Sequence, residues 1–175
     1  MILTLKRDMK KLQTISDLST SAETFSDDNE SRCSPGNNKW YQGEYKNGLY
    51  HGHGIHYDNQ QNKTYEGEWF ESEKQGYGRS YYDNGNRMYM GYYKASKFCG
   101  EGTLFYESGD IWYQGEFRDS QKNGLGVIYY PNGKKWYSGD FKYDSFNGKG
   151  TSYYRNGLFA YEGHWKKSYK NGYGV

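Results

Sequence analysis

Aromatic and glycine residues alternate with polar residues along most of the chain, and the whole pattern returns at a fixed interval of 24 residues. The trio Tyr-x-Gly occurs at Tyr41/Gly43, Tyr65/Gly67, Tyr89/Gly91, Tyr113/Gly115, Tyr137/Gly139 and Tyr161/Gly163. Two residues after each glycine comes an aromatic residue: Tyr45, Trp69, Tyr93, Phe117, Phe141, Trp165. A Gly-x-Gly pair then follows at Gly52/Gly54, Gly76/Gly78, Gly100/Gly102, Gly124/Gly126, Gly148/Gly150 and Gly172/Gly174. A constant period of this length indicates a tandem array in which each copy is one supersecondary unit.

Each copy predicts two short strands. The first strand follows the pattern aromatic-x-Gly-x-aromatic, which has the period of two that is typical of a strand. We expect a polar connection next, such as Lys46-Asn47-Gly48 or Gln121-Lys122-Asn123. The second strand is expected to run from Gly-x-Gly to a further aromatic residue, at Tyr57, Tyr81, Phe105, Tyr129 and Tyr153 in the complete copies. Helix is disfavoured, because each glycine inside a helix costs about 1 kcal/mol relative to alanine.

The pattern therefore predicts an all-β fold: an elongated single-layer antiparallel β-meander of six stacked hairpin repeats within residues 39–175. The copies span 41–64, 65–88, 89–112, 113–136, 137–160 and 161–175, of which the last is incomplete. A lone hairpin is marginal in water, whereas stacked copies bury their rings against one another. We expect the glycines of both motifs to be structural, because a bare backbone lets a neighbouring ring lie on it.

Residues 1–38 have a different character and predict a disordered tail, since the stretch from Ser19 to Asn38 is rich in Ser, Asp and Glu. Before that stretch, apolar residues recur at helical spacing beside basic ones: Leu5, Met9, Leu12, Ile15 and Leu18 with Lys6, Arg7, Lys10 and Lys11. Two interpretations stay open. The segment 2–18 is either a short basic amphipathic helix suited to a membrane surface or a partner, or part of the disordered tail with an incidental periodicity.

The composition narrows the classes of partner. The formal net charge is only +2, and no basic stripe appears, so we expect no nucleic-acid partner. Two cysteines make no disulfide framework, which favours a cytoplasmic location. No stretch approaches the roughly 20 apolar residues that a membrane-spanning helix needs.

Residue types that could carry chemistry occur in two sets. His51, His53 and His56 are close in sequence, but the other copies do not repeat them and no Cys or carboxylate stands at ligand spacing, so we expect no metal. Carboxylates recur at Glu44, Glu68, Glu116 and Asp140, and their spacing by whole copies places them along a solvated edge. General acid–base catalysis needs a pocket and a perturbed pKa, so we expect neither catalysis nor a cofactor.

The aromatic residues are the best candidates for a binding role. A single-layer sheet cannot bury all the rings of this segment, and exposed aromatic grooves mark interaction sites. Such a groove suits an extended peptide or an amphipathic helix. The candidate groove residues are Tyr45, Trp69, Tyr93, Phe117, Phe141, Trp165, Tyr81, Phe105, Tyr129 and Tyr153.

The pattern Tyr65-Glu66-Gly67-Glu68-Trp69, followed by Gly76-Tyr77-Gly78, resembles the MORN (membrane occupation and recognition nexus) repeat, and the resemblance covers residues 41–175. Copy three departs from it, with Tyr92 where most copies have Glu or Asp. The resemblance implies a non-catalytic scaffold or adaptor with a protein partner, in a cytoskeletal, ciliary or membrane-junction assembly.

Two alternatives remain open at the level of sequence. One is a peripheral module that binds anionic phospholipids, and the other is an accessory segment of a longer enzyme such as a phosphatidylinositol phosphate kinase. Since the sixth copy lacks the end of its second strand, we also expect an open C-terminal edge, through which two chains could form a homodimer.

Overall fold

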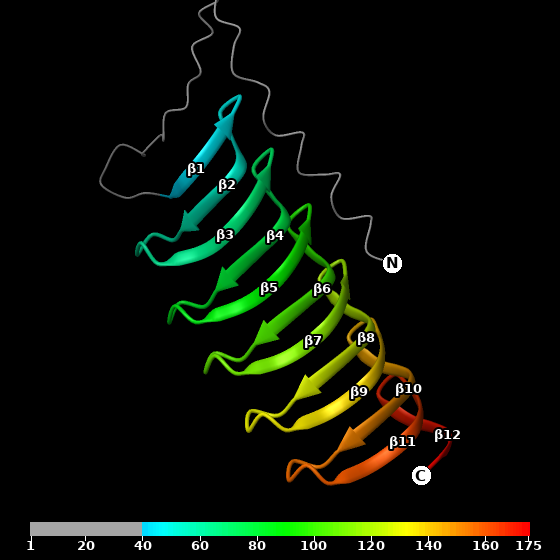
Figure 1. Cartoon of the computed structure of the whole chain (residues 1–175). Coiled ribbons are helices and arrows are strands. Elements are labelled where there is room, and N and C mark those ends of the chain that lie inside the picture. The colour runs from blue at the N-terminus through cyan, green and yellow to red at the C-terminus, as the bar shows by residue number, and fades with distance from the viewer. Residues whose placement is uncertain (1–39) are drawn as a thin grey trace, which may run out of the picture.

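The computed structural model describes residues 40–175 as one open sheet of twelve strands, in which every strand pairs antiparallel with the next along the chain (Figure 1). The first strands of the six copies are β1 (Tyr41–Lys46), β3 (Lys63–Phe70), β5 (Arg87–Lys94), β7 (Ile111–Arg118), β9 (Lys135–Lys142) and β11 (Phe159–Lys166). The second strands are β2 (Leu49–Tyr57), β4 (Glu73–Tyr81), β6 (Lys97–Phe105), β8 (Gln121–Tyr129), β10 (Ser145–Tyr153) and β12 (Tyr169–Gly174). The all-β meander of six hairpins is confirmed.

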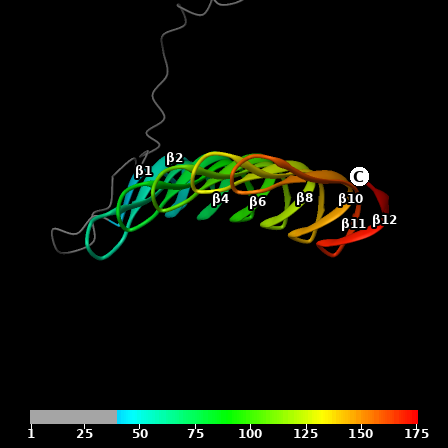
Figure 2. The same ribbon diagram turned by 90° about the horizontal axis from the view of Figure 1, so that it is seen from below.

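The sheet is a curved band, and its turns line two opposite edges (Figure 2). Short turns within each copy lie along one edge, and longer turns between copies lie along the other (Figure 1). Residues 40–175 contain no helix, so this part has none that could span a membrane. The tail expected at residues 1–38, with its helix at 2–18, falls outside the described residues.

The connection within each copy is shorter than the sequence indicated. It is a two-residue turn whose residues both have positive φ, such as Glu71 (50°) and Ser72 (65°), as in type I′ hairpins. The expected connection Gln121-Lys122-Asn123 lies inside β8 instead. Each second strand has additional residues opposite its first strand, and they lie in a bulge around the first glycine of Gly-x-Gly. Between the pairs Gly67↔Gly78 and Trp69↔Lys74, β4 uses two more residues than β3, and Gly76 there has φ +62°.

The core lies on one face of the sheet, which we call the ladder face, and consists of the rings of the Tyr-x-Gly-x-aromatic motifs. Tyr65, Tyr89, Tyr113 and Tyr137 are fully buried. Each of these rings lies flat on glycine backbone: a Cβ on Gly67 would be 2.6 Å from the Tyr65 hydroxyl oxygen. That hydroxyl donates to the carbonyl oxygen of Glu68 at 3.0 Å. The glycines of the strands are therefore needed for the close approach of the rings.

The glycines of the two motifs have two different roles. The tyrosine of each copy covers two of them, one on each strand of its hairpin, and a Cβ on either would lie within 2.8 Å of the tyrosine hydroxyl oxygen. The covered glycines pair across the sheet and are Gly43, Gly54, Gly67, Gly78, Gly91, Gly102, Gly115, Gly126, Gly139, Gly150, Gly163 and Gly174. The first glycines of Gly-x-Gly instead have φ between 57° and 82°: Gly52, Gly76, Gly100, Gly124, Gly148 and Gly172. The sequence did not separate the two sets, because both occur in the same motif.

The rings form one continuous zigzag ladder through the six copies. Tyr65 meets Trp69 of its own copy edge-to-face, with centroids 5.0 Å apart, and meets Tyr93 of the next copy at 5.1 Å. The same alternation of contacts within and between copies runs from Tyr41 to Trp165. Edge-to-face pairs contribute about 0.5–1.5 kcal/mol beyond the area that they bury. The ladder thus joins the first strands of neighbouring copies through contacts of the same geometry as those within each first strand.

A second layer covers the ladder tyrosines, and its chemistry alternates from copy to copy. In odd copies a ring stacks on the tyrosine, as Phe98 does on Tyr89 at 3.8 Å and 11°. In even copies a lysine takes that place, as Lys74 does with its Nζ 4.6 Å from the Tyr65 ring centroid. The residues at this position are Tyr50, Lys74, Phe98, Lys122, Phe146 and Lys170. This alternation has a period of 48 residues in the sequence, twice the length of one copy.

Hydrogen bonds tie neighbouring copies together at both edges. At the short turns, the Ser72 amide donates to the Tyr50 carbonyl at 3.0 Å, and the Tyr50 amide donates to Ser72 Oγ at 3.1 Å. The same pair of bonds is made by Ser96, Ser120, Asp144 and Ser168. At the long turns, a tyrosine hydroxyl donates to a carbonyl of the next copy: Tyr82 to Phe105, Tyr106 to Tyr129, Tyr130 to Tyr153. Copies two to five are therefore bonded to one another at both ends of their strands, and the first and last copies are bonded to their neighbours at the short turns.

Candidate binding surface

The residues between the ladder positions point to the opposite side of the sheet, which we call the groove face. Successive strands align these residues into two rows. The first row is Gln42, Ile55, Glu66, Arg79, Met90, Thr103, Gln114, Val127, Ser138, Thr151 and Glu162. The second row contains the facing pairs His53↔Glu68, Tyr77↔Tyr92, Glu101↔Glu116, Leu125↔Asp140 and Lys149↔His164.

Two shallow hollows run along this face. The first, of about 500 Å³, lies over β1 to β4, and the second, of about 440 Å³, lies over β4 to β8. Both include Tyr77, so the two hollows adjoin there. Glycine backbone lines both hollows between the two rows, because the glycines carry no side chain and their neighbours stand on either side. The face is therefore a trough that crosses successive strands.

The glycines between the two rows lie partly inside and partly beyond these hollows. Gly43, Gly54, Gly67 and Gly78 line the first, and Gly91, Gly102 and Gly115 line the second. The paired glycines of the later strands continue the same line and line neither of the two: Gly126, Gly139, Gly150 and Gly163. The backbone of the glycines that line the hollows therefore packs against the ladder tyrosines on one face and forms the floor of the trough on the other.

An exposed aromatic pair lies where the two hollows adjoin. Tyr77 and Tyr92 pack edge-to-face with centroids 5.5 Å apart, and they are 40% and 51% exposed. Two further apolar side chains line the second hollow: Met90, on the same strand as Tyr92, and Leu125, which is 63% exposed three strands away on β8. We call Tyr77, Met90, Tyr92 and Leu125 the central apolar cluster. Copy three contributes Tyr92 to it at the position where most copies carry an acid.

The recurring carboxylates lie on the groove face, where the expectation of a solvated edge was wrong. Each one accepts a backbone amide just past the first glycine of Gly-x-Gly, as Glu68 Oε1 does from Tyr77 at 2.9 Å. The equivalent bonds are made by Glu44, Glu116 and Asp140. A Cβ on Gly76 would collide with the Glu68 carboxylate, so the glycine makes room for this bond. These acids therefore stabilise the irregular stretch of the second strand.

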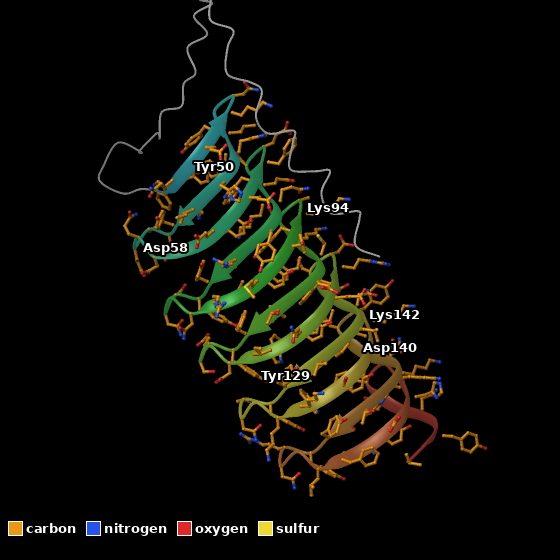
Figure 3. The ribbon with its side chains drawn as sticks, viewed as in Figure 1. Tyr50, Asp58, Lys94, Tyr129, Asp140 and Lys142 are labelled. Carbon is orange, nitrogen blue, oxygen red and sulfur yellow. The ribbon has the colours of Figure 1, made fainter. Side chains whose placement is uncertain are left out.

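The middle of the groove face is acidic and its margins are basic. The middle carries seven carboxylates, those of Glu44, Glu66, Glu68, Glu101, Glu116, Asp140 and Glu162, against the basic side chains of Arg79 and Lys149. Basic side chains follow on the same strands toward both edges: Lys63 and Arg87 beside the long turns, and Lys46, Lys94, Arg118, Lys142 and Lys166 beside the short turns. Glu66 is partly neutralised by Lys63 at 3.0 Å, and the hydrogen bond from this ammonium group lowers the pKa of the Glu66 carboxyl. In Figure 3, Asp140 lies along the sheet, between Tyr129 toward one edge and Lys142 at the edge of the short turns.

The ten aromatic residues proposed from the sequence for a partner groove divide between the two faces. Tyr45, Trp69, Tyr93, Phe117, Phe141 and Trp165 are on the ladder face, and all except the half-buried Tyr45 are 2–7% exposed. The structure assigns these six to the core, so their role in partner binding stays a prediction that their placement does not favour. Tyr81, Phe105, Tyr129 and Tyr153 alternate onto the groove face beside the long turns, where the Tyr81 hydroxyl donates to Glu66 at 2.8 Å. Phe105 is buried there beneath the Arg87 guanidinium, while Tyr81, Tyr129 and Tyr153 are half-buried.

The three clustered histidines separate in space. His53 lines the first hollow of the groove face, whereas the His56 ring lies 6.1 Å from Trp69 on the ladder face. Burial lowers the pKa of the His56 imidazole. Within residues 40–175, no three His, Cys, Asp or Glu side chains are close enough to hold a metal ion.

An open sheet with a packed aromatic ladder on one face and an exposed trough on the other defines a tandem β-hairpin array. The MORN repeat model matches residues 41–61, 65–87, 89–111, 113–135, 137–159 and 161–175, so the chain belongs to the MORN-repeat family. Repeats of this family are generally protein- or membrane-interaction modules. No curated protein matches the sequence.

Proposed function

We propose that this protein is a non-catalytic scaffold whose groove face binds a peptide or helical segment of a protein partner. The central apolar cluster carries the proposal. Its tyrosines lie where the two hollows adjoin, and Leu125 lies farther along the second hollow. These three side chains are 40–63% exposed, and aromatic side chains are enriched at the centres of protein interfaces. The surrounding polar rows supply the hydrogen-bonding rim that such interfaces need.

The charge in the middle of the groove face favours a protein partner over an anionic membrane. Lys and Arg near an anionic surface each contribute about 1 kcal/mol of binding, whereas carboxylates are repelled from it. Seven carboxylates against two basic side chains in the middle of this face make the trough a poor site for anionic lipid headgroups. We therefore place the protein as an adaptor in a cytoplasmic assembly, of the cytoskeleton, a cilium or a membrane junction, on the resemblance of its repeats.

The proposal is tested with a displayed library of random peptides selected against the full chain. The affinity of a selected synthetic peptide is then measured by calorimetry for the wild type and for Tyr92→Glu and Leu125→Glu. A buried apolar side chain contributes about 1.5–3 kcal/mol, so each variant is expected to weaken binding by about 10- to 100-fold. The matched control is Tyr143→Glu, because Tyr143 is 62% exposed in a short turn away from the trough. A peptide that binds both groove variants as tightly as the wild type would show that the site lies elsewhere.

A further inference from the structure

We propose that residues 5–18 of this same chain dock on the groove face, over the central apolar cluster, when no partner occupies it. The inference rests on the proposed function, because it makes the tail a competitor for the same site. The docked tail would make the scaffold autoinhibited, because a partner must displace the tail before it binds. Three features of the molecule support it, namely an unpaired acidic pair, a complementary segment, and a sufficient reach.

The acidic pair lies beside the central apolar cluster. Glu101 and Glu116 are directly opposite each other on β6 and β7, and like charges in facing positions destabilise a strand pair. Glu116 also accepts the Leu125 amide at 3.0 Å, whereas Glu101 takes part in none of the ion pairs among residues 40–175. A cationic group placed between the two carboxylates would relieve their repulsion. The neighbouring faces of Tyr77 and Tyr92 attract cations as well.

The complementary segment is at the start of the chain. Its apolar residues and its basic residues recur together at helical spacing: Leu5, Met9, Leu12, Ile15 and Leu18 with Lys6, Arg7, Lys10 and Lys11. The apolar side chains match the central apolar cluster, and the basic ones match the carboxylates around it. Docking on a surface is what turns such a segment into a stable helix, because an isolated helix of this length is marginal in water.

The intervening chain is long enough to reach the site. Twenty-one residues separate Leu18 from Trp40, and a flexible chain of that length has an end-to-end distance of about 25 Å. Four strand spacings from β1 to β5 amount to about 19 Å. A helix of residues 5–18 would be about 21 Å long, which is about the extent of the hollow from β4 to β8. Docking within one chain is therefore feasible without strain.

The test is zero-length cross-linking of the full chain with a carbodiimide, which joins an amine directly to a carboxylate, followed by peptide mapping of the monomer. Lys6, Lys10 and Lys11 are expected to link to Glu101 and Glu116. The variant Glu101→Gln/Glu116→Gln is expected to lose these links, with circular dichroism used to verify that it folds. The matched control is Glu107→Gln in a long turn, which is expected to leave them unchanged. Links that occur only in dimers, or that spread evenly to Glu73 and Glu107, would overturn the proposal.

A second measurement separates this proposal from the proposed function. Replacing Lys6, Arg7, Lys10 and Lys11 together by Glu is expected to tighten binding of the library-selected peptide about 3- to 10-fold, because the competitor is removed. If the cross-links are absent while the peptide binds the groove face, intrachain docking is wrong and the scaffold function stands. If the cross-links form and no peptide binds at the groove face, the docking stands and binding of a partner there is wrong.

Discussion

The tyrosine that begins each Tyr-x-Gly trio fills the core with its ring and satisfies a backbone carbonyl with its hydroxyl. Tyr113, for example, is fully buried and donates to the Glu116 carbonyl at 3.0 Å. A ring can lie this close only because the strand beneath it has no side chain. Among residues 40–175, no buried side-chain nitrogen or oxygen lacks a hydrogen-bonding partner. The thin core is therefore fully satisfied as well as closely packed, which offsets its shortage of aliphatic side chains.

Gly102→Ala is expected to destabilise the fold by several kcal/mol, because its Cβ would lie 2.6 Å from Cε2 of Tyr89, a buried ring that has no room to move. Overpacking of a core commonly costs about 1–3 kcal/mol or more. Gly133→Ala is the control: its Cβ meets nothing within 4 Å, and only its φ of +75° penalises alanine, by about 1–2 kcal/mol. Urea unfolding of the two variants measures the difference. Equal losses of stability would contradict the need for a glycine at position 102 beneath the Tyr89 ring.

Alkaline pH is expected to unfold the protein cooperatively. Burial raises the pKa of the Tyr65, Tyr89, Tyr113 and Tyr137 hydroxyls above the ordinary value of about 10. A group with a raised folded-state pKa contributes its stability fully below the unfolded-state pKa and loses it as the pH rises toward the folded-state pKa. Each such tyrosine therefore removes up to about 1.4 kcal/mol per pH unit above pH 10.

Circular dichroism and tyrosinate absorbance, followed together above pH 10, measure this effect. The buried tyrosines are expected to ionise only as the sheet unfolds, whereas exposed ones such as Tyr169 and Tyr173 are accessible to solvent throughout. Ionisation of all tyrosines before any loss of sheet would refute the burial argument.

At the scale of the hairpin, the short turns are built from residues that ordinarily avoid their conformation. Eleven of the twelve turn residues are not glycine, yet all eleven have φ between 49° and 65°. The left-handed conformation costs such residues about 1–2 kcal/mol each. The serine at the second turn position offsets this cost, because its amide and its Oγ both bond to the preceding copy. The turn is thus stabilised by the stacking of copies more than by its own sequence.

Ala95→Gly is expected to stabilise the protein by up to about 1 kcal/mol, because glycine adopts the φ of 49° without strain and the added chain entropy offsets only part of that gain. Ser120→Ala is expected to do the opposite and to cost about 0.5–1.5 kcal/mol, since the Phe98 amide loses its acceptor at 3.0 Å. Thermal unfolding measures both changes. Destabilisation by Ala95→Gly would show that the turn is not strained.

The strands were largely predictable from the sequence, but which side chains lie together on each face of the sheet was not. The period of two in Tyr65-Glu66-Gly67-Glu68-Trp69 reports a strand directly, because alternation is a local property. The contact between Tyr77 and Tyr92 depends instead on the register between β4 and β5. That register follows from the geometry of the turn and the bulge, which no single residue type predicts. The sequence showed that Tyr92 departs from the other copies, but only the pairing placed it beside Tyr77 in an exposed cluster.

At the scale of the molecule, each copy contacts only its neighbours along the sheet, so stability is close to a sum of nearest-neighbour terms. The ladder carries the coupling, and β1 and β12 are the edge strands. Local unfolding should therefore begin at the ends of the described sheet and proceed inward.

Tyr113→Ala removes a ladder ring from the middle, where it contacts Phe117 of its own copy and Phe141 of the next. It is expected to cost about 3–5 kcal/mol and to speed amide hydrogen exchange in β6 to β10. Tyr41→Ala, at the first copy, is expected to speed exchange mainly in β1 to β3. Hydrogen exchange followed by mass spectrometry maps both effects. An identical, chain-wide loss of protection in the two variants would mean that the array unfolds as one unit and not copy by copy.

A ring covers the ladder tyrosine in one copy, and an ammonium group covers it in the next. The structural repeat of this protein is therefore a pair of copies. A change of length by one copy would set ring next to ring or charge next to charge along the second layer, whereas a change by 48 residues would preserve the order. Engineered arrays of this sequence are therefore best lengthened or shortened by two copies at a time, because the alternation of ring and lysine repeats every two copies.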